Sequence, residues 1–408
     1  MFIISYKFLI GLILSYYLLL KENRTVRVLT LVQVIAYLGS WFSHVAVLTL
    51  LANLGASPLM IGVAVSMSFL PALIQGPFVG AIIDRLKPKQ LMLSLLFVEA
   101  LCTAGFILIE AKEHIWFLLI LVYIKMGAAS FYFTSEMSLL PKLLSSVKLK
   151  SANEIHSIVW SACFTIGIAL SGMAVEYFGI KTAFLIDVGL FLAAIAVFTT
   201  LDVSVKPEPK TSGFVDTFLD GLSYVFKKNP KILFIIFLHA SVGLTVFDGI
   251  ITVLAQTKYK EIISVPLAIG FLGAIRSLAL VIGPFLFSKI INKERLFYLL
   301  LAQGFAAILW GVLSGNFWSS LIGSFVCGLF TTTLWSYTMT MLQDAIDDGF
   351  YGRVIGINDM FFTATAAATS IGIGVLLDYG IGGGWALGAM GVIFVFVAVY
   401  YKLAQNRF

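Results

Sequence analysis

Long apolar runs separated by short polar turns constrain this chain more than any other feature of its sequence. A helix needs about 20 apolar residues to cross the hydrocarbon core of a bilayer. Apolar residues make up 60% of the chain and charged residues only 12%, whereas a soluble domain is about 25% charged. The mean hydropathy is +1.00. The sequence therefore predicts an all-α membrane protein with many spans, and it argues against a soluble enzyme.

Twelve runs have the length and spacing of transmembrane helices. The expected spans are residues 27–54, 59–84, 90–110, 115–137, 152–176, 182–201, 231–256, 265–288, 295–314, 317–342, 354–377 and 383–403. Prolines 71, 77 and 284 lie inside spans and are expected to bend them. The first six spans, in residues 27–201, and the last six, in residues 231–408, are expected to form two similar six-helix bundles.

The ends of the chain and the middle connection are polar or short. The apolar run from Phe8 to Leu20 is too short for a span, so we interpret residues 1–26 as an interfacial segment. A thirteenth span is the open alternative. Residues 202–230 are expected to form a linker with an amphipathic helix bearing Phe214, Phe218, Leu222 and Val225. A disordered linker is the alternative reading.

The distribution of Lys and Arg predicts the orientation. With both termini in the cytoplasm, only four cations are external and two, Lys125 and Arg276, fall within the membrane. The other 21 of the 27 Lys and Arg residues are then cytoplasmic. Such a bias is typical of cytoplasmic loops, and it accounts for the net charge of +6 without a nucleic-acid partner.

Two sequence patterns indicate a transporter. Gly76-Pro77-Phe78 recurs as Gly283-Pro284-Phe285, 207 residues later, which suggests duplicated halves. The stretch 76–89, GPFVGAIIDRLKPK, ends an apolar run in Gly80, Asp84, Arg85 and Lys89. This stretch resembles the loop between helices 2 and 3 of the major facilitator superfamily.

Further segments resemble one branch of that superfamily, the bacterial exporters that include macrolide efflux and enterobactin export proteins. They are Phe69-Leu70-Pro71, Leu140-Pro141 with Ala152-Asn153, and Gly352-Arg353-Val354. The resemblance implies twelve helices in two bundles, alternating access, and a cavity lined by helices 1, 4, 7 and 10. It also implies a gate in which Asp84 meets Arg353 and which includes Gly80, Arg85 and Lys89.

Ionisable residues inside membrane spans are costly and therefore mark candidate functional sites. Asp248 in helix 7 is the expected proton carrier, and Arg276 in helix 8 lies at a similar depth and is expected to tune it. A structural ion pair between the two is the rival reading. The expected substrate cavity takes residues from helices 1, 4 and 10, namely His44, Lys125, Tyr132, Thr332, Trp335 and Tyr337.

These features predict a monomeric, proton-coupled exporter of small amphipathic molecules in the bacterial inner membrane, with lipid, protons and a small substrate as partners. A transporter of an anionic metabolite or siderophore, suggested by Lys125 and Arg276, is the first alternative, and a lipid flippase is another. The sequence shows neither a catalytic set nor a metal or phosphate motif, so we expect no enzyme activity and no cofactor or metal.

Overall fold

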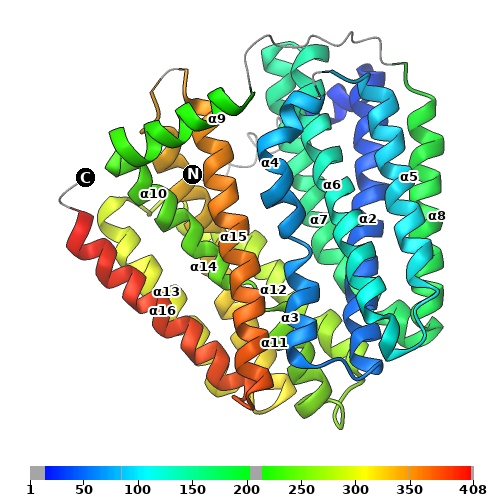
Figure 1. Ribbon diagram of the computed structural model, residues 1–408, viewed down its shortest axis with the longest axis vertical. Helices are drawn as coiled ribbons and strands as arrows, with labels where there is room; N and C mark the ends of the chain where they lie inside the picture. Colours follow the sequence, from blue (N-terminus) through cyan, green and yellow to red (C-terminus); the bar gives the residue numbers. More distant parts are fainter. Residues whose placement is uncertain (1–13, 84, 203–213, 348, 406–408) are drawn as a thin grey trace.

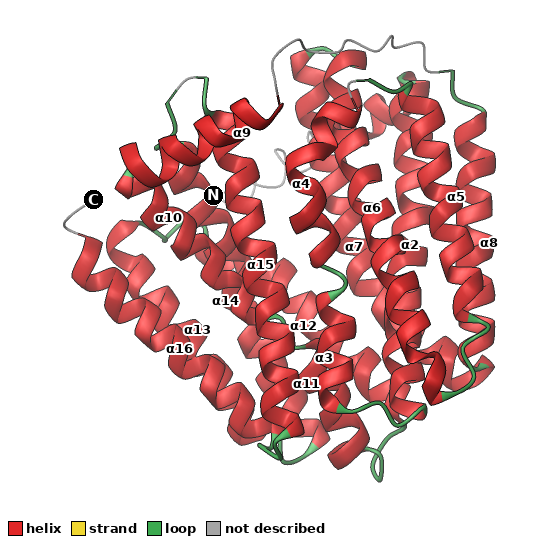
Figure 2. Ribbon diagram, in the orientation of Figure 1, coloured by secondary structure: helices red, strands yellow, loops and turns green. Residues whose placement is uncertain are grey.

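The chain folds into helices, because a backbone inside hydrocarbon must satisfy its own hydrogen bonds. The computed structural model describes residues 14–83, 85–202, 214–347 and 349–405, and the regular elements in these ranges are all helical (Figures 1 and 2). Twelve helical segments within them are long and apolar enough to cross a membrane. The all-α fold with twelve spans is therefore confirmed.

Six spans form the half of the molecule that we call the N bundle. Its helices are α2 (Arg24–Asn53), α3 (Pro58–Ser66) continued by α4 (Leu70–Ile83), α5 (Pro88–Phe106), α6 (Ile115–Leu143), α7 (Ser146–Phe178) and α8 (Ile180–Thr199). Helix α2 packs against α7 and α8, and α5 packs against α6 and α8. Polar caps set several starts: the Asn23 side chain accepts from the Val26 amide, and Ser57 precedes Pro58 at the first turn of α3.

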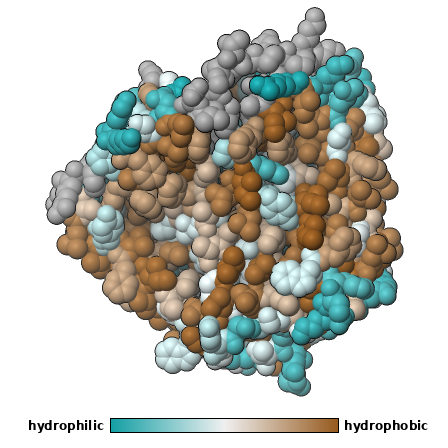
Figure 3. All heavy atoms as spheres, viewed as in Figure 1, coloured by the Kyte–Doolittle hydropathy of each residue, from teal (hydrophilic) through white to brown (hydrophobic). Residues whose placement is uncertain are grey.

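The other six spans form the C bundle. Its helices are α10 (Pro230–Ala240) continued by α11 (Asp248–Leu254), α12 (Val265–Phe287), α13 (Lys293–Leu313), α14 (Phe317–Gln343), α15 (Tyr351–Asp378) and α16 (Gly383–Ala404). Helix α13 packs along α16, and α12 along α14. On the face shown in Figure 3, apolar residues predominate across the middle and hydrophilic residues gather toward both ends, as a bilayer requires.

The segment between the bundles carries helix α9 (Phe214–Ser223), followed by a π-helical turn over Tyr224–Lys228. Leu222 and Phe218 pack on the core of the C bundle, and Val225 is fully buried there. A helix is thus present in the expected linker, while the side chain of Phe214 lies outside the described residues and the interfacial role stays a prediction. We call the end of the molecule that carries α9 the linker end, and the opposite end, with the turns at 54–57 and 260–264, the far end (Figure 1).

The two bundles meet mainly through α3 with α15 and through α7 with α12. Glycines allow the closest backbone approaches. A Cβ atom added to Gly62 would lie 2.4 Å from the carbonyl oxygen of Ser370 and 3.0 Å from the Cα of Gly374. A Cβ on Gly172 would lie 2.8 Å from the Pro266 carbonyl oxygen. Both contacts lie toward the far end, so this is where the bundles fit together most tightly.

Helix boundaries differ from the sequence predictions in two places. Helix α6 runs to Leu143 and α7 begins at Ser146, whereas the spans were expected to end at 137 and begin at 152. Helices can extend beyond the hydrocarbon, so hydropathy placed these ends too far inside. The second span is interrupted at 67–69, just ahead of Pro71 in the first turn of α4.

The terminal segment is described only in part. Residues 1–13 of the expected interfacial segment lie outside the described residues, while residues 14–22 are helical and only Asn23 separates them from α2. Leu14 and Tyr17 are exposed, and Leu19 packs on Val26 of α2.

Candidate functional site

The seventh span is broken at the residues that carry its acid. Helix α10 ends at Ala240, a 3₁₀ turn covers Ser241–Thr245, and Val246 is extended before α11 begins at Asp248. The break places Asp248 at the start of a helix, where the helix dipole favours a carboxylate. Broken helices of this kind are typical of transporter binding sites.

Asp248 makes a contact between the bundles. Its Oδ1 atom lies 3.3 Å from Nε2 of His44 on α2, and the two side chains are 28% and 22% exposed. The two predicted residues are therefore brought together, one from each bundle. The pair is partly accessible, so a proton or water can reach it.

Arg276 supports the break. Its Nη2 donates to the carbonyl oxygen of Thr245, and its guanidinium lies 5.2 Å from the centre of the Phe247 ring. An Asp248–Arg276 ion pair, the rival reading, is not among the ion pairs of the described residues, in which Asp248 pairs with His44. Arg276 thus holds the turn that positions Asp248, because it binds a carbonyl that the break removes from the helical ladder.

Lys125 forms a buried ion pair within the N bundle. Its Nζ lies 2.8 Å from Oδ2 of Asp187 on α8, and the side chains are 5% and 0% exposed. Ser43 also donates to Asp187 Oδ2, and the Lys125 ammonium lies 5.0 Å from the centre of the Phe191 ring. The charge of Lys125 is therefore balanced inside one bundle.

A small cavity of about 40 Å³ lies beside these two pairs. It is lined by Ser40, Ser43, His44 and Lys125, together with apolar residues of α2, α3, α5 and α6. A space of this size has room for a few water molecules. The cavity connects the surroundings of the His44–Asp248 pair with those of the Lys125–Asp187 pair.

Helix α14 supplies the other predicted cavity residues. Trp335 is 41% exposed, and its ring lies 5.6 Å from the ring of His239 on α10. Tyr337 packs partly on the core of the C bundle, and Thr332 is half-buried. Tyr132 on α6 is 2% exposed and belongs to the core of the N bundle. Of these four, Trp335 presents the most surface.

The predicted gate is described only in part. Asp84 lies outside the described residues, as does the surface of Gly80, so their contact with Arg353 stays a prediction. Arg353 binds Asp220 of α9 through Nη1 and Oδ2 at 2.6 Å. Arg85 is exposed, and the Nζ of Lys89 donates to the Thr199 carbonyl at 2.9 Å.

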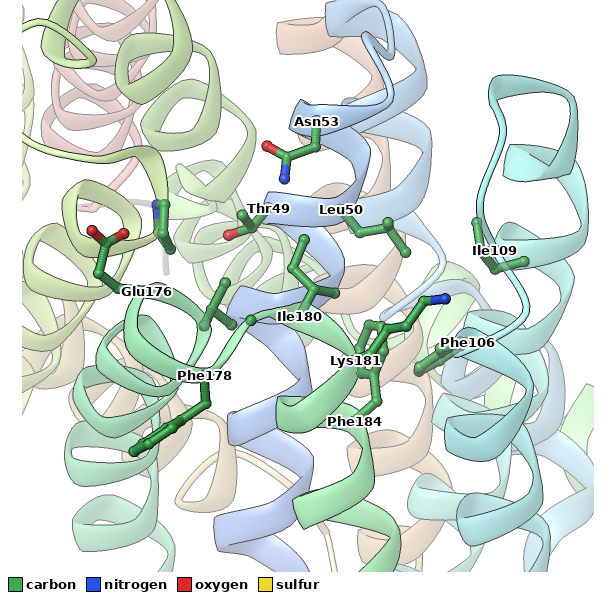
Figure 4. Close-up of a pocket in the computed structure, with 13 residues that line it drawn as sticks. Thr49, Leu50, Asn53, Phe106, Ile109, Glu176, Phe178, Ile180, Lys181 and Phe184 are labelled. Carbon is green, nitrogen blue, oxygen red and sulfur yellow. The ribbon is translucent and has the colours of Figure 1, made fainter.

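A larger pocket of about 490 Å³ opens at the far end of the N bundle (Figure 4). Its wall is mostly apolar, with Thr49 and Asn53 of α2 and the charged Glu176 and Lys181 at its edge. Lys181 binds Glu110 in the loop before α6. This hydrogen bond and the lysine charge hold the pKa of the Glu110 carboxyl below its usual range.

One polar cluster was missed in the sequence. Gln33 of α2, Glu136 of α6 and His156 of α7 meet inside the N bundle and are 3%, 0% and 6% exposed. The predicted spans placed Glu136 one residue before an end and His156 four residues after a start. The longer helices bury both residues, and the signal that would have found them is the helical pattern continuing past Glu136. Across the described residues, no three His, Cys, Asp or Glu side chains gather as a metal site.

Comparison with known proteins agrees with the geometry. A structure titled as the nucleoside transporter NupG has a TM-score of 0.71 at 14% identity, covering 93% of this chain and 97% of that one. The POT family transporter PepTSo gives 0.70 at 12% identity, covering 94% and 98%. These identities show a shared fold and leave the substrate open.

Sequence relatives agree at the level of the family. The chain is 27% identical over 222 residues to YfiS, an uncharacterized MFS-type transporter of Bacillus subtilis (strain 168). This match covers 53% of the chain, which spans about half the length of that relative. The model of the Major Facilitator Superfamily matches residues 29–293, more than half of the chain. The chain therefore belongs to the Major Facilitator Superfamily.

Proposed function

We propose that this protein is a proton-coupled exporter of small amphipathic organic molecules that works by alternating access. Family membership supports secondary transport, and the motif resemblance to bacterial exporters supports efflux. We place it in the bacterial inner membrane with both termini and the linker end in the cytoplasm, in keeping with the Lys and Arg bias.

The observation that carries the proposal is the contact between His44 and Asp248. It joins the two bundles at 3.3 Å and stays partly accessible. A proton on Asp248 removes the negative charge from this contact, so protonation weakens the attraction between the bundles. Proton binding and bundle movement are thereby coupled at one pair, which is what a proton-driven transporter needs.

The packing of the two bundles relates this contact to one state of the transport cycle. The bundles approach most closely near Gly62 and Gly172, toward the far end. His44 lies nine residues before the far end of α2 at Asn53, about 14 Å at 1.5 Å per residue. We therefore assign the His44–Asp248 contact to the state that is closed at the far end. Opening that end requires the contact to separate.

The two cations that suggested an anionic substrate have other partners. Lys125 pairs with Asp187, and Arg276 binds the Thr245 carbonyl. This favours an uncharged or amphipathic substrate over an anionic metabolite or siderophore. The half-buried to exposed hydroxyl and aromatic groups of Thr332 and Trp335 suit such a ligand.

A thermal-shift screen of drug-like compounds on purified protein should first supply a substrate. Proteoliposomes with a pH gradient should accumulate it, and Asp248→Asn should abolish gradient-driven accumulation while leaving exchange of substrate across the membrane without a gradient. Asp344→Asn, an exposed acid at the end of α14, is the matched control and should transport like wild type. Wild-type accumulation by well-folded Asp248→Asn would remove Asp248 from coupling. If the protein moved a labelled phospholipid across the membrane as fast as it moved the substrate, a flippase would be favoured instead.

A further inference from the structure

The cluster of Gln33, Glu136 and His156 lies apart from the contact between the bundles. Its members come from α2, α6 and α7, three helices of the N bundle, and all three are buried. Gln33 is the tenth residue of α2, which begins at the linker end, and Glu136 lies seven residues before the end of α6 at the same side. The cluster thus lies in the half of the bundle nearer the linker end.

The hydrogen bonds of the cluster centre on one amide group. Gln33 Nε2 lies 2.6 Å from Glu136 Oε1 and 2.5 Å from His156 Nδ1. An amide nitrogen carries two hydrogens, so it donates to both neighbours. His156 then accepts at Nδ1 and is the neutral tautomer with its proton on Nε2. Glu136 receives a single hydrogen bond.

Several polar atoms at this place lack partners. Within the part of the chain that the structure describes, Glu136 Oε2, His156 Nε2 and Gln33 Oε1 have no hydrogen-bond partner, and neither do the hydroxyls of Tyr37 and Tyr132. Buried polar groups are usually satisfied, and an unsatisfied group calls for an explanation. Five such atoms at one site show that a charge on Glu136 would receive little stabilisation beyond the Gln33 amide.

The surrounding charges favour a neutral Glu136 over an ionised one. Tyr37 of α2 and Tyr132 of α6 interact electrostatically with Glu136, and Glu99 of α5 and Cys163 of α7 interact with these tyrosines. Each of these is neutral or negative. The described ion pairs of Lys and Arg involve other acids. An ionised Glu136 would therefore be a buried charge without a counter-ion, which is strongly unfavourable.

We propose that the Gln33–Glu136–His156 cluster is a second proton-binding site, in which Glu136 holds a proton in this conformation. Gln33 and His156 are positioning residues that orient the carboxyl. A proton removes the charge that the site cannot balance. It requires no ligand beyond the groups already present, whereas a metal ion would add charge next to the neutral His156.

One face of α2 leads from this site to the contact between the bundles. Positions 33, 37, 40 and 44 are spaced by three or four residues, so they follow one face of the helix. The Tyr37 ring lies 5.7 Å from the His156 ring, and the Ser40 hydroxyl lies 3.5 Å from Glu99. His44 then reaches Asp248. This arrangement makes the cluster the proton-binding site nearer the linker end. Its role in transport rests on the proposed function.

Infrared difference spectroscopy tests the protonated carboxyl without any substrate. At neutral pH, the spectrum of wild type should contain a carboxylic-acid C=O band that is missing in Glu136→Gln and retained in Glu99→Gln, the matched buried acid of α5. Loss of carboxylate bands alone in Glu136→Gln would overturn the proposal. His156→Gln should shift the same band, because it changes the partner of the Gln33 amide.

The folding of the variant is itself informative. Gln has the shape of a protonated Glu, so Glu136→Gln should unfold at the wild-type temperature. A variant that fails to fold would show that an ionised carboxylate is needed and would also overturn the proposal. The infrared spectrum reports the protonation of Glu136 whether or not Asp248 couples transport. Failure of the proposed function and failure of this site can therefore be distinguished.

Discussion

The buried pair of Lys125 and Asp187 gives the sharpest prediction for stability. Both side chains are almost completely buried, at 5% and 0% exposure, and their charged atoms are 2.8 Å apart. In Lys125→Met the Asp187 carboxylate keeps only hydroxyl donors, Ser43 and Thr103. Removing one partner of a buried ion pair costs about 3–5 kcal/mol. The lower end applies, since Asp187 can take up a proton and become neutral.

Equilibrium unfolding in mixed detergent micelles would measure this loss. The double variant Lys125→Met/Asp187→Leu should recover most of the stability, because replacing a whole buried pair by apolar side chains is often neutral or favourable. A Lys125→Met protein as stable as wild type would refute the reasoning. A double variant no more stable than the single one would refute it as well.

The exposed pair of Lys181 and Glu110 is the matched control. Its side chains are 59% and 64% exposed, and solvent screens such pairs. Lys181→Met should therefore change stability little. The Lys181 partner lowers the pKa of Glu110, so any contribution is present above the unfolded-state pKa and is lost as the pH falls through the lowered one.

Three further changes have distinct outcomes. Gly62→Ala places a Cβ 2.4 Å from a carbonyl oxygen of α15 and should shift spin-label distances between the bundles toward opening at the far end, while Gly372→Ala, which meets open space, should leave them unchanged. Arg276→Met leaves the carbonyl that it binds in the break without its partner and should cost about 1–3 kcal/mol of unfolding free energy; unchanged stability would exclude the supporting role. Arg353→Gln removes the ion pair with Asp220 and should speed amide exchange in α9; identical exchange would show that apolar packing alone holds that helix.

Most of the fold could be predicted from hydropathy and charge, because a span must be apolar and about 20 residues long. The pairing of His44 with Asp248 could not, since their helices belong to different bundles and sequence shows no distance between them. The break before Asp248 was also missed, because the residues of the turn, SVGLT, include no proline and no charged residue.

The missed cluster has a different cause. Glu136 and His156 fall near the ends of the predicted spans, where water could solvate them, because the apolar pattern fades before the helices α6 and α7 stop. Burial by neighbouring helices is a tertiary property that hydropathy along one segment does not contain. The Lys125–Asp187 pair illustrates the same limit: both residues fall inside predicted spans, and only packing shows that they meet.

The two glycine contacts between the bundles have a mechanical consequence. One joins α3 to α15 near Gly62 and Gly374, and the other joins α7 to α12 near Gly172 and Gly270. Two points define a line, and a rotation of one bundle about this line preserves both contacts while the linker ends swing through the largest arc. Any movement that parts the far end must instead break both contacts. The same small residues therefore form the rotation axis when the linker end opens, and they oppose opening of the far end.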